Sequence, residues 1–339
     1  MKKIVRLLVG LSALLLALSF TACSKKETKP TTSESSTTAS SSTETSTDDK
    51  AISLKTPIDH TWGTVTVRSK WIKFDKPYIV EDEFSSQIAA VGDYLIILTD
   101  KTKLNKYKID GDTLKLQDSW TLDQNYEILS QGPDNTFFLS GFMSPLLRMD
   151  LNGKKIASYT KTDQATINSD GKTGLDTWPG KTPRKLTLGE TNVVTEPLSE
   201  FEGYFITRSV TLNNHKFLLG SAPDTEPYKA YVLDNDYKLI QTLGSDDFTE
   251  DSSLGAIESI IETDKYYVLL DDLYDKLSIW DKNGNFAGSI DEEDLFGTNH
   301  TWNYTSTTAS DGTVYIGLNE SREEDKEITE LLIFKVSGL

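Results

Sequence analysis

Cysteine is almost absent from this chain: Cys23 is the only one in 339 residues. The segment beyond it therefore contains no disulfide, no thiol nucleophile and no cysteine-ligated zinc. Histidine is scarce too, and none of the three copies stands in a His-x-x-x-His or His-Glu-x-x-His spacing. A domain of this composition must be held together by its apolar core, and the chain is long enough to build one.

Arginine and catalytic motifs are also lacking. Five arginines follow Arg6, namely Arg68, Arg148, Arg184, Arg208 and Arg322. Because arginines are so few, we do not expect a carboxylate clamp of three arginines, of the kind that sialidases use. The chain contains no Gly-x-Ser-x-Gly elbow and no phosphate-binding Walker loop. The sequence therefore favours a non-catalytic role, although catalytic residues that are scattered along a chain escape a search for linear motifs.

No apolar run is long enough to span a membrane as a helix. The run at residues 7–18 is well short of the ~20 residues that a bilayer requires. It follows Lys2, Lys3 and Arg6 and precedes small residues, which is the pattern of a secretory signal. Residues 1–22 are therefore predicted to be a signal peptide.

The end of this signal, Phe20-Thr21-Ala22-Cys23, resembles the lipobox of bacterial lipoproteins. The resemblance implies that Cys23 is lipidated, becomes the mature N-terminus and anchors the protein on the extracytoplasmic face of the cell membrane. Phe20 departs from the Leu that is usual there. The alternative is an ordinary signal peptide followed by an incidental cysteine.

Residues 23–50 are predicted to be a disordered tether. Sixteen of the 27 residues after Cys23 in this segment are Ser or Thr, and almost none is apolar. Such a composition cannot offset the entropy lost on ordering. It is similar to the stalks of Gram-positive surface lipoproteins.

Residues 51–339 carry an internal repeat that predicts an all-β domain. Apolar strands led by an aromatic residue are centred at Tyr94, Phe137, Phe217, Tyr266 and Tyr315. Subtraction gives intervals of 43, 80, 49 and 49 residues, so a degenerate unit is expected between Asp150 and Tyr204. Hairpin turns rich in Asp, Asn and Gly alternate with these strands. Two hairpins per repeat make a four-stranded unit, the size of one propeller blade.

The repeat count predicts a β-propeller of six blades. The strand at residues 64–74 precedes the first repeat, and the last repeat ends one strand short. We therefore expect this N-terminal strand to complete the last blade and to close the ring. From about Thr61 onward the chain resembles bacterial six-bladed propellers of the NHL/TolB-like kind. A β-sandwich pair built from similar hairpins is the alternative.

A repeated tripeptide provides the first candidate ligand-binding residues. The sequence His-Thr-Trp occurs twice, at His60 to Trp62 and at His300 to Trp302. If the ring closes as predicted, both copies could approach the central channel, where indole faces stack on sugars and apolar groups. The alternative is that the match is accidental and that both indole rings pack in the core.

A long loop provides the second set of candidates. Residues 174–184 contain Trp178, two prolines and Arg184 in an irregular stretch. Loops on a rigid scaffold are where binding residues concentrate. A surface insertion without a ligand is an equally good interpretation.

The charge of the chain limits its partners. The net charge is −17, and loss of three signal-peptide cations brings it to about −20. Such a surface repels nucleic acid, so no nucleic-acid partner is expected. Acidic clusters such as Asp291–Asp294 favour solvated faces, and no EF-hand loop is present; we expect no cofactor, with loosely held Ca²⁺ as the alternative.

Together these features predict a monomeric, lipid-anchored binding protein that recognises an envelope protein, peptide or glycan. The alternatives are an extracellular hydrolase or lyase with its site at the channel mouth, and a non-catalytic scaffold for envelope assembly. Convergent titratable groups at the mouth would favour the enzyme, exposed aromatics would favour binding, and an apolar plug would favour the scaffold.

Overall fold

The structure is a computed structural model. It describes residues 57–62, 65–80, 86–212, 214–225, 227–297, 301–321 and 329–339, all within the compact unit Ser46–Leu339. The predicted signal peptide, Cys23, the predicted tether and His300 lie outside the described residues.

Four sheets have four antiparallel strands each, in an order that follows the chain. The first contains β8 (Ile128–Gln131), β9 (Thr136–Ser140), β10 (Pro145–Asp150) and β11 (Lys155–Lys161). The second contains β12 (Gln164–Ile167), β13 (Thr173–Thr177), β14 (Arg184–Leu188) and β15 (Val193–Pro197). The third contains β16 (Phe205–Thr211), β17 (Lys216–Ser221), β18 (Lys229–Leu233) and β19 (Leu239–Leu243). The fourth contains β20 (Ile257–Glu262), β21 (Tyr266–Asp271), β22 (Lys276–Asp281) and β23 (Phe286–Asp291).

A fifth, ten-stranded sheet joins the two ends of the described chain. Its main path is β24-β25-β26-β2-β7-β6-β5-β4, with β1 paired to β2 and β3 paired to β26. The bounds are β1 (Ile58–Trp62), β2 (Val65–Phe74), β3 (Ile79–Val80), β4 (Gln87–Val91), β5 (Tyr94–Thr99), β6 (Lys103–Asp110), β7 (Thr113–Thr121), β24 (Thr301–Thr308), β25 (Val314–Ser321) and β26 (Thr329–Ser337). Short helices η2 (Ser199–Phe201) and α3 (Glu292–Phe296) lie in connections between sheets.

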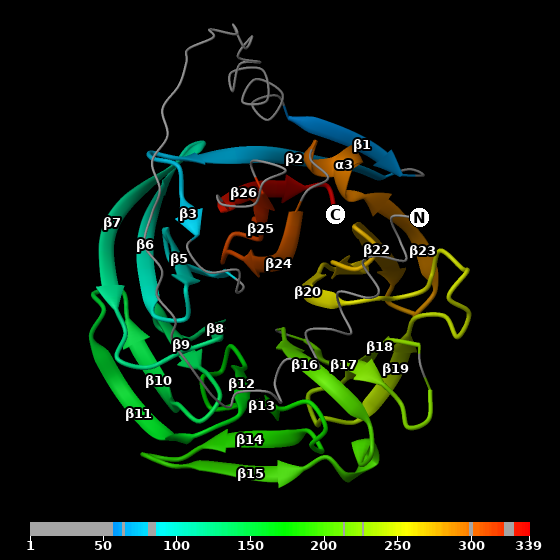
Figure 1. Ribbon diagram of the computed structural model, residues 1–339, viewed down its shortest axis with the longest axis horizontal. Coiled ribbons are helices and arrows are strands. Elements are labelled where there is room, and N and C mark those ends of the chain that lie inside the picture. The colour runs from blue at the N-terminus through cyan, green and yellow to red at the C-terminus, as the bar shows by residue number, and fades with distance from the viewer. Residues whose placement is uncertain are drawn as a thin grey trace, which may run out of the picture. The chain divides into compact units, whose positions relative to one another are not determined.

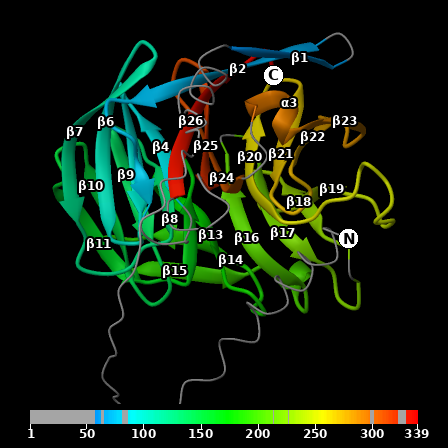
Figure 2. The ribbon, with the colours of Figure 1, turned by 45° about the horizontal axis from the view of Figure 1, so that its top comes forward.

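The sheets surround a common centre in a propeller-like arrangement, with β8, β12, β16, β20 and β24 innermost (Figure 1). A tilted view shows the same radial order (Figure 2). The prediction of an all-β, propeller-type domain is confirmed.

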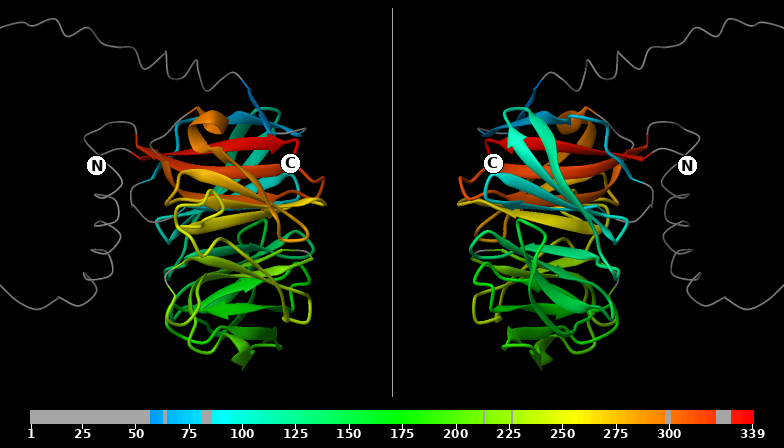
Figure 3. Two further views of the ribbon diagram at one scale, coloured as in Figure 1. Left: turned by 90° about the vertical axis from the view of Figure 1, so that its right-hand side faces the viewer. Right: turned by 90° about the vertical axis from the view of Figure 1, so that its left-hand side faces the viewer.

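The N-terminal strand pairs with the C-terminal one, as the repeat predicted. β2 is antiparallel to β26, with Ile72 opposite Ile333. On its other side β2 meets β7 in a short parallel contact of two residue pairs, Lys73 with Thr113 and Phe74 with Leu114. Side views show β2 and β26 as neighbours at one edge of the domain (Figure 3). The two ends of the domain are thus joined by backbone hydrogen bonds.

The degenerate repeat expected between Asp150 and Tyr204 is also a complete four-stranded sheet, β12–β15. Its second strand, β13, has no aromatic residue at its start, which is why the repeat is weak in the sequence.

Turns lie at two opposite ends of each sheet because neighbouring strands are antiparallel. We call one the hairpin end, where turns join first to second and third to fourth strands. We call the other the crossover end, where turns join second to third strands and where the chain passes to the next sheet. Contacts such as that of Thr211 with Ile167, both near the hairpin end of adjacent first strands, show that these ends align from sheet to sheet.

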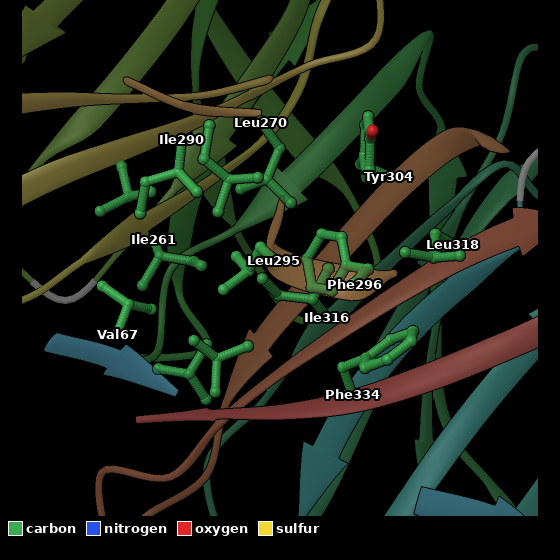
Figure 4. Close-up of a cluster of buried hydrophobic side chains, with 14 of the residues drawn as sticks. Val67, Ile261, Leu270, Ile290, Leu295, Phe296, Tyr304, Ile316, Leu318 and Phe334 are labelled. Atoms are coloured by element: carbon green, nitrogen blue, oxygen red, sulfur yellow. The ribbon is translucent and has the colours of Figure 1, made fainter. Parts of the chain in front are cut away.

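Apolar side chains fill the spaces between neighbouring sheets. In one cluster Val67 of β2, Phe296 of α3 and Phe334 of β26 are all at most 2% exposed (Figure 4). Their burial contributes about 1.5–3 kcal/mol per large side chain. This packing positions the turns at both ends on a rigid support.

Candidate functional site

A cavity of about 210 Å³ lies between the first strands, and all six of β4, β8, β12, β16, β20 and β24 contribute to its lining. Serine, threonine and aliphatic residues make up most of this lining, and none of the described lining residues is aromatic. Its charged members are Arg208, Glu258 and Glu262. The central channel is therefore a narrow, hydroxyl-rich space.

Many of these hydroxyls bond to the neighbouring sheet. The Thr307 Oγ1 atom of β24 accepts a hydrogen bond from the Ala90 backbone of β4 at 2.9 Å. The Thr211 Oγ1 atom of β16 donates to the Ile167 carbonyl of β12 at 3.0 Å, and Ser130 Oγ of β8 accepts from the Ile167 amide at 3.2 Å. These side chains connect first strands that share no backbone ladder. Their hydrogen bonds are a structural reason for the polar lining.

Two charged residues of the channel form a similar connection. Arg208 of β16 pairs with the Glu258 carboxylate of β20 at 2.5 Å and donates to the Glu258 carbonyl at 2.7 Å. Ser259 of β20 and Ser306 of β24 share a hydrogen bond of 2.7 Å. Glu258 is thus held in an ion pair with Arg208 that links β16 to β20.

Trp178, predicted from the loop sequence, lies in the β13–β14 turn at the crossover end. Its ring stacks on that of Phe142 in the β9–β10 turn of the neighbouring sheet, with centroids 4.0 Å apart and planes 24° apart. Phe142 is 44% exposed and the adjacent Met143 is 54% exposed. We call these three residues the aromatic platform.

The turn that carries the platform has an unfavourable backbone. The Ser144 amide donates to the Gly141 carbonyl at 3.0 Å, which makes Phe142 and Met143 the two central residues. Met143 has φ of 60°, in the left-handed region where Gly or Asn is usual at this position of a type II turn. Such a conformation costs a residue with a side chain about 1–3 kcal/mol.

The same turn is fixed to the connection between β7 and β8. Ser144 Oγ donates to the Asn125 carbonyl at 2.8 Å. Gly141 packs so closely that a Cβ there would lie 2.6 Å from the same carbonyl oxygen. The platform is therefore held on a rigid base.

Arg184, the second residue predicted from this loop, lies at the start of β14. Its Nη2 atom bonds to Asp163 at 2.7 Å and to Asp176 at 2.5 Å. Burial raises the pKa of Asp176, and the positive charge of Arg184 opposes this effect. Lys181 also bonds to Asp163, at 3.1 Å. Arg184 is thus engaged with two carboxylates that brace the turn beneath Trp178.

The structure does not bring the two His-Thr-Trp segments together in the way the repeated tripeptide suggested. His60 and Trp62 lie on β1, the outer strand, whereas Trp302 lies on β24, the innermost strand. Strands β2, β26 and β25 separate them, which is about 19 Å at ~4.8 Å per strand. His60 Nδ1 is 3.9 Å from an Asp294 carboxylate oxygen on α3. Strand β2 closes the ring as predicted, but β1 adds to β2 rather than entering the channel, so His60 and Trp62 do not lie beside β24.

Acidic residues at the crossover end have altered ionisation. Burial, followed by the nearby charge of Glu258, raises the pKa of Asp272 to about 7. Burial also raises the pKa of Asp271, whose carboxylate accepts backbone hydrogen bonds from Gly255 and Ala256.

Within the described ranges, no group of three or more His, Cys, Asp or Glu side chains is arranged to hold a metal ion. No helix in that part of the chain has the length and apolar character to cross a membrane.

The sequence did not reveal a cluster of polar side chains at the hairpin end. Glu262 bonds to His215 at 2.5 Å and to Lys282 at 2.8 Å, and it lines both the channel and a neighbouring pocket. These residues come from three separate turns and strands of two sheets. No linear spacing reveals them, although each lies beside a predicted hairpin turn.

Comparison with known proteins identifies the fold only. No family model matches the sequence, and no curated protein matches it. The β-propeller domain of Cps50 (Swd1) from Myceliophteria thermophila has a TM-score of 0.50 and 10% identity, covering 78% of this chain and 100% of that one. Hydrazine synthase of Kuenenia stuttgartiensis has a TM-score of 0.49 and 12% identity, covering 71% of this chain and 78% of that one. The class that the fold defines is the β-propeller.

Proposed function

We propose that this protein is a lipid-anchored, extracytoplasmic propeller that binds a protein, peptide or glycan partner with its crossover end. The observation that carries the proposal is the aromatic platform. Aromatic residues and Met are enriched where proteins bind partners, because they bury a large area at low entropic cost.

The strain at Met143 supports a role outside folding. Met143 holds a left-handed backbone conformation and yet exposes more than half of its side chain. A glycine there would fold at lower cost, and neither Phe142 nor Met143 adds much to the core. A partner that buries both side chains accounts for their presence.

The blade count is six in this proposal. The ten-stranded sheet divides at the two-residue contact of β2 with β7 into the runs β24-β25-β26-β2 and β7-β6-β5-β4. These two runs and the four separate sheets make six units of four strands each.

The binding test is recovery of partners from envelope extract by the full chain. We expect Met143→Gly to raise the unfolding temperature, because it relieves strain, and yet to lower partner recovery. Phe142→Ala is expected to lower recovery as well. Ile156→Ala, at an equally exposed apolar position on outer strand β11, is the matched control and is expected to change nothing. Undiminished recovery with both platform variants would show that partners bind elsewhere.

The lipid anchor rests on the lipobox resemblance at Cys23. We expect Cys23→Ala to move the chain from the membrane fraction to the medium or periplasm. The substitution removes the thiol that carries the lipid, and two or more acyl chains are needed for stable anchoring. Intact-mass measurement of the membrane fraction provides the direct readout. Membrane retention of Cys23→Ala, or an unmodified Cys23 in the wild type, would refute the anchor.

A further inference from the structure

A second pocket lies at the hairpin end, between the third and fourth sheets. Its volume is about 370 Å³, at the small end of the ~300–1,000 Å³ typical of small-molecule sites. It is lined by Asn214, His215, Ile240, Gln241, Glu262, Thr263, Asp264, Tyr267 and Lys282. Asn214 and Glu262 also line the central channel, so the pocket adjoins the channel mouth.

Glu262 is bonded on one side only. Its Oε1 atom accepts from His215 Nδ1 at 2.5 Å and from Lys282 Nζ at 2.8 Å. Its Oε2 atom is buried and receives no hydrogen bond from any described residue, although the side chain is only 7% exposed. A buried carboxylate oxygen without a donor is costly, which makes this atom the strongest unmet acceptor of the pocket.

Gln241 presents a second acceptor of the same kind. Its Nε2 atom donates to the Lys282 carbonyl at 2.9 Å, and this bond determines which end of the amide carries the oxygen. The Oε1 atom is buried and receives no hydrogen bond within the described part of the chain. Two residues of the pocket therefore carry buried acceptors that no described donor satisfies.

The charges around the pocket favour a neutral ligand. An anion would meet the carboxylates of Glu262 and Asp264. A cation would compete with Lys282, which already neutralises Glu262 and lies 3.8 Å from the centre of the Tyr267 ring. Lys282 and Asn214 can in turn donate to ligand oxygens. Ile240, 47% exposed, provides an apolar wall.

We propose that this pocket binds a neutral, polyhydroxylated molecule of monosaccharide size, with one hydroxyl donating to Glu262 Oε2 and another to Gln241 Oε1. Sugar hydroxyls both donate and accept, which matches walls that present acceptors and donors together. The aliphatic C–H groups of the ring contact Ile240. The site is at the end opposite the aromatic platform, so it is separate from the partner surface proposed above.

The test is calorimetric titration of the full chain, purified in a detergent without sugar head groups. The neutral probes are glucose, galactose, mannose and N-acetylglucosamine; glucosamine and glucuronate are the charged probes of similar size. We expect saturable binding of at least one neutral sugar at millimolar concentrations or below, and at least tenfold weaker binding of both charged probes.

Variants then assign the binding to the pocket. In Glu262→Gln the amide oxygen keeps the hydrogen bond from Lys282, and an NH₂ group replaces the acceptor Oε2. The affinity for the sugar is therefore expected to fall about tenfold to hundredfold. Ile240→Trp fills the pocket from an exposed position and is expected to abolish binding with an unchanged unfolding temperature. Glu258→Gln, on the same strand β20 but at its other end, is the control and is expected to bind normally.

Three results would overturn the proposal. The first is that no neutral sugar binds saturably. The second is that a charged probe binds as tightly as the neutral sugars. The third is that Ile240→Trp binds like the wild type. None of these results bears on the aromatic platform, whose variants lie at the other end of the sheets.

Discussion

Asp272, at the crossover end, provides a quantitative prediction about stability and pH. The carboxyl follows β21, is partly buried and accepts a hydrogen bond from the Asn303 amide at 3.0 Å. Burial and the nearby charge of Glu258 raise its pKa from 3.8 to about 7. Asparagine has the same shape and retains an acceptor for Asn303 but does not ionise.

The direction in which pH changes the free energy of unfolding follows from the number of protons bound in the folded and unfolded states. Near pH 4 to 7 the folded chain keeps the proton on Asp272, whereas the unfolded chain loses it from about pH 3.8. The folded state then binds more protons, so the free energy of unfolding falls as pH rises through this range. Roughly three pH units at ~1.36 kcal/mol each set an upper limit of about 4 kcal/mol, reached above pH 7.

The assay is urea unfolding of the compact unit that begins at Ser46, at pH values from 4 to 8. We expect Asp272→Asn to match the wild type near pH 4 and to exceed it by up to about 4 kcal/mol at pH 8. Asp246→Asn, on an exposed side chain of the same end, is the control for removal of a surface carboxylate. Parallel curves for wild type and Asp272→Asn would refute the reasoning.

Two further substitutions test the packing of the ring. The Ile72 side chain in β2 is 1% exposed, so Ile72→Ala is expected to lower the free energy of unfolding in urea by about 2–5 kcal/mol. The control, Val194→Ala at a half-exposed position, is expected to lower it by less than about 0.5 kcal/mol. Equal losses would contradict the role of β2 in the core. Gly220→Ala places a Cβ 2.1 Å from the Phe205 carbonyl oxygen and is expected to lower the unfolding temperature by the equivalent of about 1–3 kcal/mol. An unchanged unfolding temperature would show that β16 and β17 do not approach so closely.

The fold was predictable because its repeat is written in local chemistry. Tyr94, Phe137 and Tyr315 each lie in the second strand of a unit, where an aromatic-led apolar strand is buried between neighbouring sheets. The turns follow the same rule: Gly111 and Gly153 have positive φ, as hairpin turns require. The degenerate unit lacks the aromatic-led strand, because β13 begins with Thr173, and it could be inferred only from the spacing of the other repeats.

The candidate sites were predictable only in part, because they join residues of different sheets. Trp178 was named as a candidate because of its irregular loop, but Phe142, on which it stacks, lies in a four-residue turn that no sequence motif marks. His215 and Glu262 are in contact because adjacent first strands align at the hairpin end. The position of β1 was missed for a related reason: the repeat predicts the strands inside a unit, but not an extra strand that adds to the outer edge.

The hydroxyl-rich channel bears on where a function can reside. A ring without disulfides needs connections between first strands, which share no backbone ladder, and Ser130, Thr211 and Thr307 provide them through hydrogen bonds to neighbouring backbones. Side chains engaged in this way cannot be replaced or reoriented without loss of stability, which leaves the channel wall little room to vary for a ligand. The strained platform at Met143 lies outside these connections, and Glu262, although it bonds to His215 of the neighbouring sheet, keeps one carboxylate oxygen without a hydrogen bond from the described residues. Selection for binding can act on the turns at both ends while the ring stays intact, which is why we assign both proposed sites to the rims of the propeller.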